Sequence, residues 1–432
     1  MMLSVIGTGY LGATHAAAMA ELGHEVVGVD TDAAKVAALA RGEVPFYEPG
    51  LPELLSKHVA GGSLRFTDSV AEAVASAEVH FVCVGTPQKA GEFAADVSYV
   101  DAAFAAVAKH VRPGTVVVGK STVPVGTAAR LAVGVQAAGA ELVWNPEFLR
   151  EGFAVKDTLQ PDRIVMGSAE GAGTAELERV YAPILAAGIP LVQTDFATAE
   201  LVKVAANSFL ATKISFINAM AEVCEVIGAD VTLLAEAIGH DERIGHRFLH
   251  AGLGFGGGCL PKDIRAFMAR AGELGVDQAV SFLKNVDEIN QRRRARTVDL
   301  AREMCDGSLA GRRVGVLGAA FKPNSDDIRD SPALDVALAI QKAGSAVRVY
   351  DPQAMGNARE SYPTLAYAPS ALDACQDADV VLHLTEWQEF RDLTPEALAE
   401  VVKVQSIVDG RGALDPQTWR DAGWQFRALG RP

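Results

Sequence analysis

A glycine-rich turn between a strand and a helix constrains the fold of this chain more than any other feature. A short apolar strand near the N-terminus runs directly into a Gly-x-Gly-x-x-Gly pattern at Gly7, Gly9 and Gly12. A helical stretch and a second apolar strand follow, and that strand ends at Asp30. Strand, glycine turn, helix, strand and acid in this order form the dinucleotide fingerprint of a parallel α/β sheet. The sequence therefore predicts a Rossmann-type domain at the N-terminus.

Each residue of this fingerprint has a distinct physical task. Gly7 makes the tight turn, Gly9 lets the backbone approach a pyrophosphate, and Gly12 lets the helix pack closely on the strand. The Asp30 carboxylate would accept hydrogen bonds from the ribose hydroxyls and would repel a 2′-phosphate. The pattern therefore predicts NAD rather than NADP as the cofactor.

A second informative stretch surrounds Cys259. Three consecutive glycines, residues 256–258, precede this cysteine, and Pro261 fits the first position of a new helix. The positive end of the helix dipole and the neighbouring Lys262 would favour the thiolate, and Asp263 follows one turn on. The alternative is a glycine-rich turn with an inert cysteine that caps a helix.

Length, charge and cysteine usage narrow the class of protein. A chain of 432 residues exceeds one typical domain, so we expect two or three. The net charge of −15 argues against nucleic acid and anionic membranes as partners. We expect no membrane span, because no uncharged apolar run is long enough, and no signal peptide, because the first strand begins at Leu3. Five scattered cysteines without metal or disulfide spacing favour the reducing cytoplasm.

The chain is organised as an α/β region, a helical region and a second α/β region. Strands of the first region end near Thr86, near Thr122 and before residues 145–151, so these segments should face the nucleotide. The second α/β region looks like a degenerate copy of the first that lacks the later glycines. Its Lys322 and Arg329 suggest an anionic ligand other than NAD.

These observations predict two doubly wound parallel sheets joined by a long central helix. We expect an NAD-binding domain over residues 1–196, a helical domain over residues 197–300 and a second Rossmann-like domain over residues 311–432, with the active site between the two sheets. The long helix, residues 198–228, has apolar residues on more than one face, so one core cannot bury them all. A homodimer that pairs this helix with its copy is therefore expected.

The chain resembles the nucleotide-sugar 6-dehydrogenases of the UDP-glucose/GDP-mannose dehydrogenase family. The matching segments span nearly the whole chain in the expected order, and they are residues 7–12, 46–51, 84–87, 121–127, 145–152, 200–207, 241–245, 255–263, 321–329 and 409–411. One departure is visible, because Gly258 stands where the family usually has a serine before the cysteine. The change removes a hydroxyl but no group with a proposed chemical role.

The resemblance implies a four-electron oxidation of UDP-glucose at C6, from alcohol to acid, with two NAD and one water. Cys259 would trap the aldehyde as a thiohemiacetal, which then becomes a thioester. Lys203 and Asn207, four residues apart on the long helix, would stabilise the oxyanion. Glu147 would act on the hydrolytic water together with Thr122 and Asp263, although the sequence leaves open how proton transfer is divided. No metal is expected, since all the reacting groups are organic.

The resemblance also implies the binding residues. For NAD these are Gly7, Gly9, Tyr10, Leu11, Gly12, Asp30, Lys35, Thr86, Thr122, Glu151 and Arg329. For the nucleotide sugar they are Glu147, Phe148, Leu149, Lys203, Asn207, Arg243, His250, Phe255, Gly256, Lys322 and Arg411. In the family, the counterpart of Arg243 reaches the sugar site from the neighbouring subunit. The loop of residues 250–256 would wrap the uracil and ribose.

Several alternatives stay open at this point. The Lys203–Asn207 pair could be an ordinary polar stripe on a helix, and Lys322 and Arg411 could form structural salt bridges. The substrate could be GDP-mannose or a UDP-N-acetyl-hexosamine rather than UDP-glucose. A non-catalytic NAD-binding scaffold on this fold is the alternative from a different class of protein.

Overall fold

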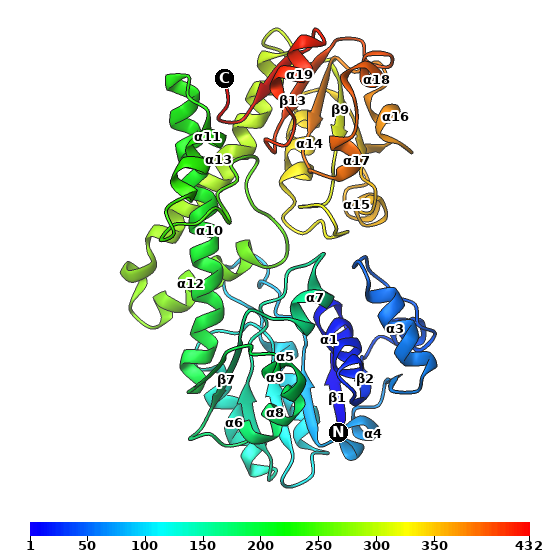
Figure 1. Ribbon diagram of the computed structural model, residues 1–432, viewed down its shortest axis with the longest axis vertical. Coiled ribbons are helices and arrows are strands. Elements are labelled where there is room, and N and C mark those ends of the chain that lie inside the picture. The colour runs from blue at the N-terminus through cyan, green and yellow to red at the C-terminus, as the bar shows by residue number, and fades with distance from the viewer. The chain divides into compact units, whose positions relative to one another are not determined.

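The computed structural model describes residues 1–432, and the chain divides into two compact units. The first unit combines Met1–Ala206 with Arg265–Gly275, and the second combines Asn207–Ile264 with Val276–Pro432. Each unit is built around one sheet, and the long helix α10 (Phe196–Ile227) begins in the first unit and ends in the second (Figure 1).

The first unit contains an eight-stranded sheet in the order β3-β2-β1-β4-β5-β6-β7-β8. Its strands are β1 (Met2–Ile6), β2 (Glu25–Val29), β3 (Leu64–Thr67), β4 (Val79–Val82), β5 (Val116–Gly119), β6 (Glu141–Trp144), β7 (Ile164–Ser168) and β8 (Leu191–Thr194). All neighbours are parallel except β6 and β7, which are antiparallel. The predicted doubly wound sheet is confirmed, and β3 at one edge and β7 and β8 at the other extend it beyond the strands that the sequence indicated.

Helices cover both faces of this sheet. They are α1 (Tyr10–Glu21), α2 (Ala33–Ala40), α3 (Leu51–Ala60), α4 (Val70–Ser76), α5 (Ser98–Ala108), α6 (Thr127–Ala137), α7 (Ala154–Leu159), α8 (Thr174–Val180) and α9 (Ala182–Ala186). One buried core joins α1, α3, α8 and α9 to one face, and another joins α5, α6 and the start of α10 to the other. The alanines of α1 leave little side-chain bulk, so this helix is buried along most of its length.

The second unit contains a six-stranded parallel sheet in the order β11-β10-β9-β12-β13-β14. Its strands are β9 (Arg313–Leu317), β10 (Ala346–Tyr350), β11 (Ala366–Tyr367), β12 (Val380–His383), β13 (Ser406–Asp409) and β14 (Gln425–Ala428). Its helices are α14 (Pro332–Lys342), α15 (Met355–Ser361), α16 (Ala371–Cys375), α17 (Gln388–Arg391), α18 (Pro395–Ala399) and α19 (Pro416–Asp421). The strand order repeats that of β3 to β6, as expected of an internal copy.

Between the two sheets in sequence lies a helical region. Besides α10 it comprises α11 (Val231–Gly239), α12 (Leu260–Glu273), the 3-10 helix η1 (Asp277–Val280) and α13 (Phe282–Glu303). Ion pairs tie α13 to α10, because the buried Arg293 contacts Glu225 at 2.5 Å and Arg292 contacts Glu222 at 3.3 Å. The predicted central helix is thus confirmed, two residues earlier at its start than the sequence pattern indicated. None of the helices combines the length and the apolar character needed to cross a membrane.

The packing of β5 against β6 generates a stability prediction. A methyl group on Gly119 would lie 2.1 Å from the indole of the buried Trp144, whereas one on Gly134 in α6 would meet nothing within 4 Å. We expect Gly119→Ala to lower the free energy of unfolding by about 2 kcal/mol through overpacking. Gly134→Ala, the matched control, should raise it by about 0.5 kcal/mol, since alanine is the better helix residue. Urea titration of both variants checks this, and equal midpoints would contradict it.

Candidate functional site

The glycine turn after β1 has the geometry that a dinucleotide requires. Gly7 adopts a positive φ of 89°, and a Cβ on Gly12 would lie 1.8 Å from the Gly7 carbonyl oxygen. A Cβ on Gly9, in contrast, would meet nothing within 4 Å. Gly7 and Gly12 are therefore glycine for internal packing reasons, and Gly9 leaves open the space into which a pyrophosphate fits. The residues present fit NAD.

Asp30 follows β2 and accepts hydrogen bonds near the glycine turn. Its Oδ2 accepts from the Thr8 backbone N–H at 2.9 Å and from Lys35 Nζ at 3.1 Å. Burial alone would raise the pKa of Asp30, but hydrogen bonds from the Asp32 backbone and from Lys35 outweigh it and lower the pKa. The carboxylate is therefore ionised at neutral pH, as recognition of ribose hydroxyls requires.

Glu48 connects the glycine turn to the segment after β6. This buried carboxylate accepts from the backbone N–H groups of Gly152 at 2.6 Å and Ala154 at 2.7 Å, and from the Tyr10 hydroxyl. Burial, together with the Glu48 carboxylate, raises the pKa of Tyr10 well above its usual range. The sequence analysis matched the segment of residues 46–51 to the family but assigned Glu48 no role, because its two backbone partners are more than a hundred residues away.

Glu147 lies directly after β6 and is held from both sides. Its Oε1 accepts from the Phe148 N–H at 2.7 Å and the Leu149 N–H at 2.9 Å. Its Oε2 forms an ion pair with Lys120 Nζ at 3.2 Å. Lys120, at the end of β5, is a second residue that the sequence analysis missed.

The loop between β5 and α6 is fixed to α10. Buried Glu200 accepts from the backbone N–H groups of Gly126 at 2.7 Å and Ala128 at 2.6 Å. Burial raises the pKa of Glu200. The Thr86 hydroxyl donates to the Thr122 carbonyl at 2.8 Å, which ties the loops after β4 and β5 together.

Lys203 lies on α10 one turn after Glu200 and is itself buried. Its Nζ is 5.5 Å from the centroid of the Phe148 ring, next to Glu147 in sequence. The first unit therefore brings Lys203 and the Glu147–Phe148 segment together at the carboxyl edge of its sheet. It places the Thr86–Thr122 pair on neighbouring strand ends of the same edge.

In the second unit, Cys259 is exposed immediately before α12. Its carbonyl accepts from the Asp263 N–H at 3.0 Å, the first hydrogen bond of the helix. Buried Asp263 accepts from Asn207 Nδ2 at 2.7 Å and also contacts Lys262 Nζ. The helix starts at Leu260, so Pro261 is its second residue and not its first. The missing N–H of proline is tolerated at the second position too, because the first N–H groups of a helix have no partner within it.

The loop before Cys259 is clamped by side chains of α10 and α13. Asn290 accepts from the Phe255 N–H at 2.7 Å and donates to the Phe255 carbonyl at 2.8 Å. Asn218 accepts from the Gly252 N–H at 2.9 Å. Neither asparagine was identified from the sequence.

Arg411 donates to the carbonyls of Gly254 at 3.1 Å, Phe321 at 2.9 Å and Leu384 at 2.7 Å. Burial lowers the pKa of Arg411. In this structure its guanidinium organises three loops at the carboxyl edge of the second sheet, and its contact with a nucleotide remains a prediction. Lys322 lies near the same edge, with its Nζ 5.3 Å from the centroid of the Phe321 ring.

Gly258 departs from the family pattern for a visible reason. A Cβ at this position would lie 2.1 Å from the guanidinium carbon of Arg329. Asp327 holds Arg329 at 2.7 Å and accepts from the Gly258 N–H at 3.3 Å. Glycine therefore gives Arg329 room against the backbone next to Cys259.

Two predicted substrate residues lie on the surface of the second unit. Arg243 is exposed and pairs with Asp241 at 2.6 Å, an interaction that raises the pKa of the arginine. His250 is also exposed. The structure joins neither side chain to the Cys259 loop by a described contact, so both assignments remain predictions.

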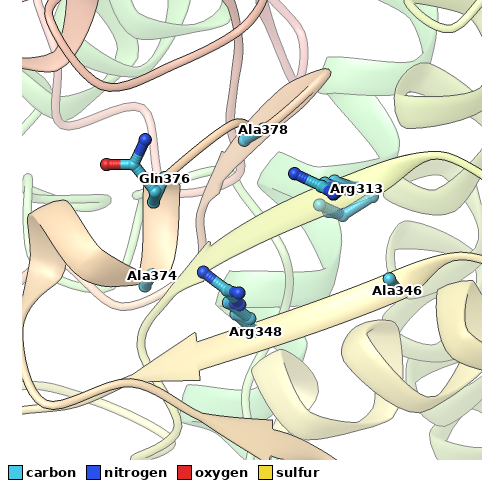
Figure 2. A pocket seen from close by; sticks show the side chains of 7 residues that line it. Arg313, Ala346, Arg348, Ala374, Gln376 and Ala378 are labelled. Atoms are coloured by element: carbon cyan, nitrogen blue, oxygen red, sulfur yellow. The ribbon is translucent and has the colours of Figure 1, made fainter.

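Figure 2 shows a separate pocket of the second unit. It lies over the first residues of β9 and β10, beside the end of α16, and it is lined by Arg313, Val314, Ala346, Arg348, Ala374, Gln376 and Ala378. Because ligands of parallel sheets bind beyond the carboxyl ends of the strands, this pocket is not part of the candidate site.

Three models of one family match successive parts of the chain. The NAD binding domain of the UDP-glucose/GDP-mannose dehydrogenase family matches residues 1–185, its central domain matches residues 197–292 and its UDP binding domain matches residues 315–416.

Individual relatives match over the full length. The UDP-glucose 6-dehydrogenase of Rhizobium meliloti (strain 1021) is 42% identical, with 100% of both chains covered. The UDP-glucose 6-dehydrogenase TuaD of Bacillus subtilis (strain 168) is 40% identical over 100% of this chain and 93% of its own. The structure of a UDP-glucose dehydrogenase from the archaeon Pyrobaculum islandicum superimposes with a TM-score of 0.91 at 38% identity, covering 100% of this chain and 98% of that one. With the glycine turn, the cysteine loop and all three domain models in one chain, this protein belongs to the UDP-glucose/GDP-mannose dehydrogenase family.

Proposed function

We propose that this protein is an NAD-dependent UDP-glucose 6-dehydrogenase, which oxidises UDP-glucose to UDP-glucuronate and forms two NADH per sugar. Full-length relatives of that name at 42% and 40% identity support the substrate. The observation that carries the chemistry is Cys259, an exposed thiol at the N-terminus of a helix. An inert capping cysteine would need no exposed sulfur and no fixed loop before it.

The first unit would hold NAD and the second the nucleotide sugar. NAD would lie on the turn from Gly7 to Gly12, with its ribose on Asp30 beside Lys35. The remaining NAD contacts that we propose are Thr86, Thr122, Glu151 and Arg329. When bound, NAD supplies the hydride acceptor for both oxidations.

Cys259 would form the covalent intermediates. After the alcohol is oxidised, the thiolate adds to the aldehyde carbon, and the thiohemiacetal becomes a thioester upon the second oxidation. Lys203 and Asn207 would stabilise the oxyanion, and both are already buried, as a water-excluded charge site requires. Glu147, with Thr122 and Asp263, would direct the water that hydrolyses the thioester.

For the nucleotide, we propose that Lys322 and Arg411 face the diphosphate and that the loop before Cys259 receives the uracil and ribose. The two hydrogen bonds between Asn290 and the backbone of Phe255 support this, because a preorganised loop loses less entropy on binding. A cytoplasmic location is proposed as well, since Cys259 must stay reduced.

The substrate assay decides between the candidates. We expect the purified protein with NAD to form two NADH for each UDP-glucose consumed, measured by the absorbance of reduced nicotinamide at ~340 nm. GDP-mannose and UDP-N-acetylglucosamine should give rates at least tenfold lower in kcat/KM, about 1.4 kcal/mol of discrimination. Faster turnover of GDP-mannose would reassign the substrate. Absence of NADH with every nucleotide sugar would support the non-catalytic scaffold.

Replacing the nucleophile tests the covalent mechanism. Cys259→Ser should lower turnover by at least about 10³-fold, because a hydroxyl is a far weaker nucleophile than a thiolate. Binding of UDP-glucose and NAD, measured by calorimetry, should change little. Cys375→Ser is the matched control, since that thiol is buried at the end of α16 against Gly315 of β9, and it should keep the rate. Two NADH per sugar at the wild-type rate from Cys259→Ser would refute the thioester route.

A homodimer through α10 is the third part of the proposal. Phe209, Phe216 and Val223 recur every seven residues on this helix and are 66%, 50% and 49% exposed. A seven-residue apolar repeat forms one stripe along a helix, and a two-fold axis pairs such a stripe with its copy. In such a dimer Arg243 would reach the sugar site of the neighbouring subunit.

The stripe gives a direct test of assembly. Phe216→Asp should convert a dimer of about twice the 45.4 kDa chain mass into monomer in sedimentation, because it places a charge in an apolar contact. Leu372→Asp, at an exposed leucine of α16, is the control and should leave the dimer intact. A wild-type protein that sediments as monomer at micromolar concentration would rule out the interface.

A further inference from the structure

Lys120 is a buried cation that the mechanism above does not use. It directly follows β5, its side chain is 4% exposed, and its Nζ lies 2.9 Å from Asn145 Oδ1 and 3.2 Å from Glu147 Oε2. Taking a lysine out of water is costly unless its charge is paired, and an apolar residue of similar size is often as good for stability. The positive charge of Lys120 is therefore more easily explained by an effect on its ion-pair partner, Glu147, than by a contribution to stability.

That partner, Glu147, is held in a single orientation. One carboxylate oxygen accepts two backbone N–H groups and the other faces Lys120, while 17% of the side chain stays exposed. The geometry of Asn145 is fixed too, because its Nδ2 donates to the Val165 carbonyl at 2.7 Å. Lys120 thus joins β5 to a rigid segment after β6 that still has one open side.

The other titratable groups around this pair are neutral near pH 7. Tyr181 donates to Asn145 Oδ1 at 2.8 Å, and burial raises its pKa to about 12. Burial also raises the pKa of the Cys83 thiol to about 12 and lowers that of His15, on α1, well below its usual value. Burial alone would lower the pKa of Lys120, but Glu147, with Tyr181 and Cys83, outweighs it and raises the pKa.

Two further cations face the same segment from the side of Phe148. Lys203 Nζ lies 5.5 Å from the centroid of that ring, and the Arg163 guanidinium lies 3.8 Å from it. Neither forms a described ion pair with Glu147, whereas Lys120 does. Within this cluster, Lys120 is therefore the cation that acts on Glu147 directly.

We propose that Lys120 is a positioning residue that holds the Glu147 carboxylate oriented to accept the proton of the hydrolytic water. The inference rests on the proposed function. In this step the water oxygen bonds to the thioester carbon, its proton passes to Glu147, and the carbon–sulfur bond breaks. Cys259 leaves as the thiolate, and the open side of Glu147 returns the proton to solvent. Lys120 acts through Glu147 and touches no reacting atom.

Removal of the charge should affect hydrolysis and spare the oxidations. In Lys120→Met, Glu147 loses the cation that holds its Oε2, so the hydrolytic water loses its oriented proton acceptor while both hydride transfers keep their geometry. Rapid mixing should still give a burst approaching two NADH per site, followed by turnover reduced about 100-fold. Acid-quenched protein should carry the sugar as a mass increase on Cys259.

Two matched variants separate this role from a structural one. Lys120→Arg keeps the charge and should keep steady-state turnover within about threefold of wild type. Tyr181→Phe removes a neutral member of the same cluster and should lower the melting temperature without accumulation of the covalent adduct on Cys259. If Lys120→Met fails to fold, accumulation of that adduct in Lys120→Arg overturns the proposal.

The opposite results are equally clear. Wild-type turnover in Lys120→Met, or loss of the NADH burst in proportion to turnover, would overturn the role of Lys120 while leaving the dehydrogenase assignment intact. A wild-type protein that forms no NADH from UDP-glucose would instead defeat the proposed function, and this inference with it.

Discussion

The candidate site depends on buried side chains that bind the backbone of loops at the carboxyl edges of the two sheets. Glu48 and Glu200 each accept two backbone N–H groups, and Asn290 binds both the N–H and the carbonyl of Phe255. Loops cannot satisfy their own polar groups as helices and strands do, so such side chains supply the missing partners. The loops that carry Glu147 and Cys259 are in this way rigid before any ligand binds.

Burial of these acids also has an electrostatic consequence. Each accepts hydrogen bonds from N–H dipoles, which stabilise a carboxylate where water cannot. For Glu200, burial prevails and the pKa rises, so its charge is held less firmly than that of an exposed acid. Glu147, which is only partly buried, differs from these two acids because it forms an ion pair with the buried Lys120.

Local motifs were readable from the sequence because their chemistry lies within a few residues. The glycine turn, Asp30 and the cysteine at a helix start fall in this class, as does the repeated strand order that two similar segments indicated. The supporting residues were not readable, because each acts over a long separation. Glu48 binds residues 104 and 106 positions away, Glu200 binds one 72 away, and Asn290 binds one 35 away. The sequence around a single Glu or Asn does not indicate such a distant partner, because only the fold brings the two together.

Gly258 is a residue whose role becomes clear only when the sequence and the fold are compared. In the sequence, glycine at this position lacks the hydroxyl of serine, and no effect of that difference can be stated. In the fold it is the space that Arg329 fills, with its guanidinium 2.1 Å from where a Cβ would be. Any larger residue would have to displace this arginine and with it the Asp327 contacts that hold the Gly258 backbone. Gly258 thus leaves room for the Arg329 guanidinium against the backbone that precedes Cys259.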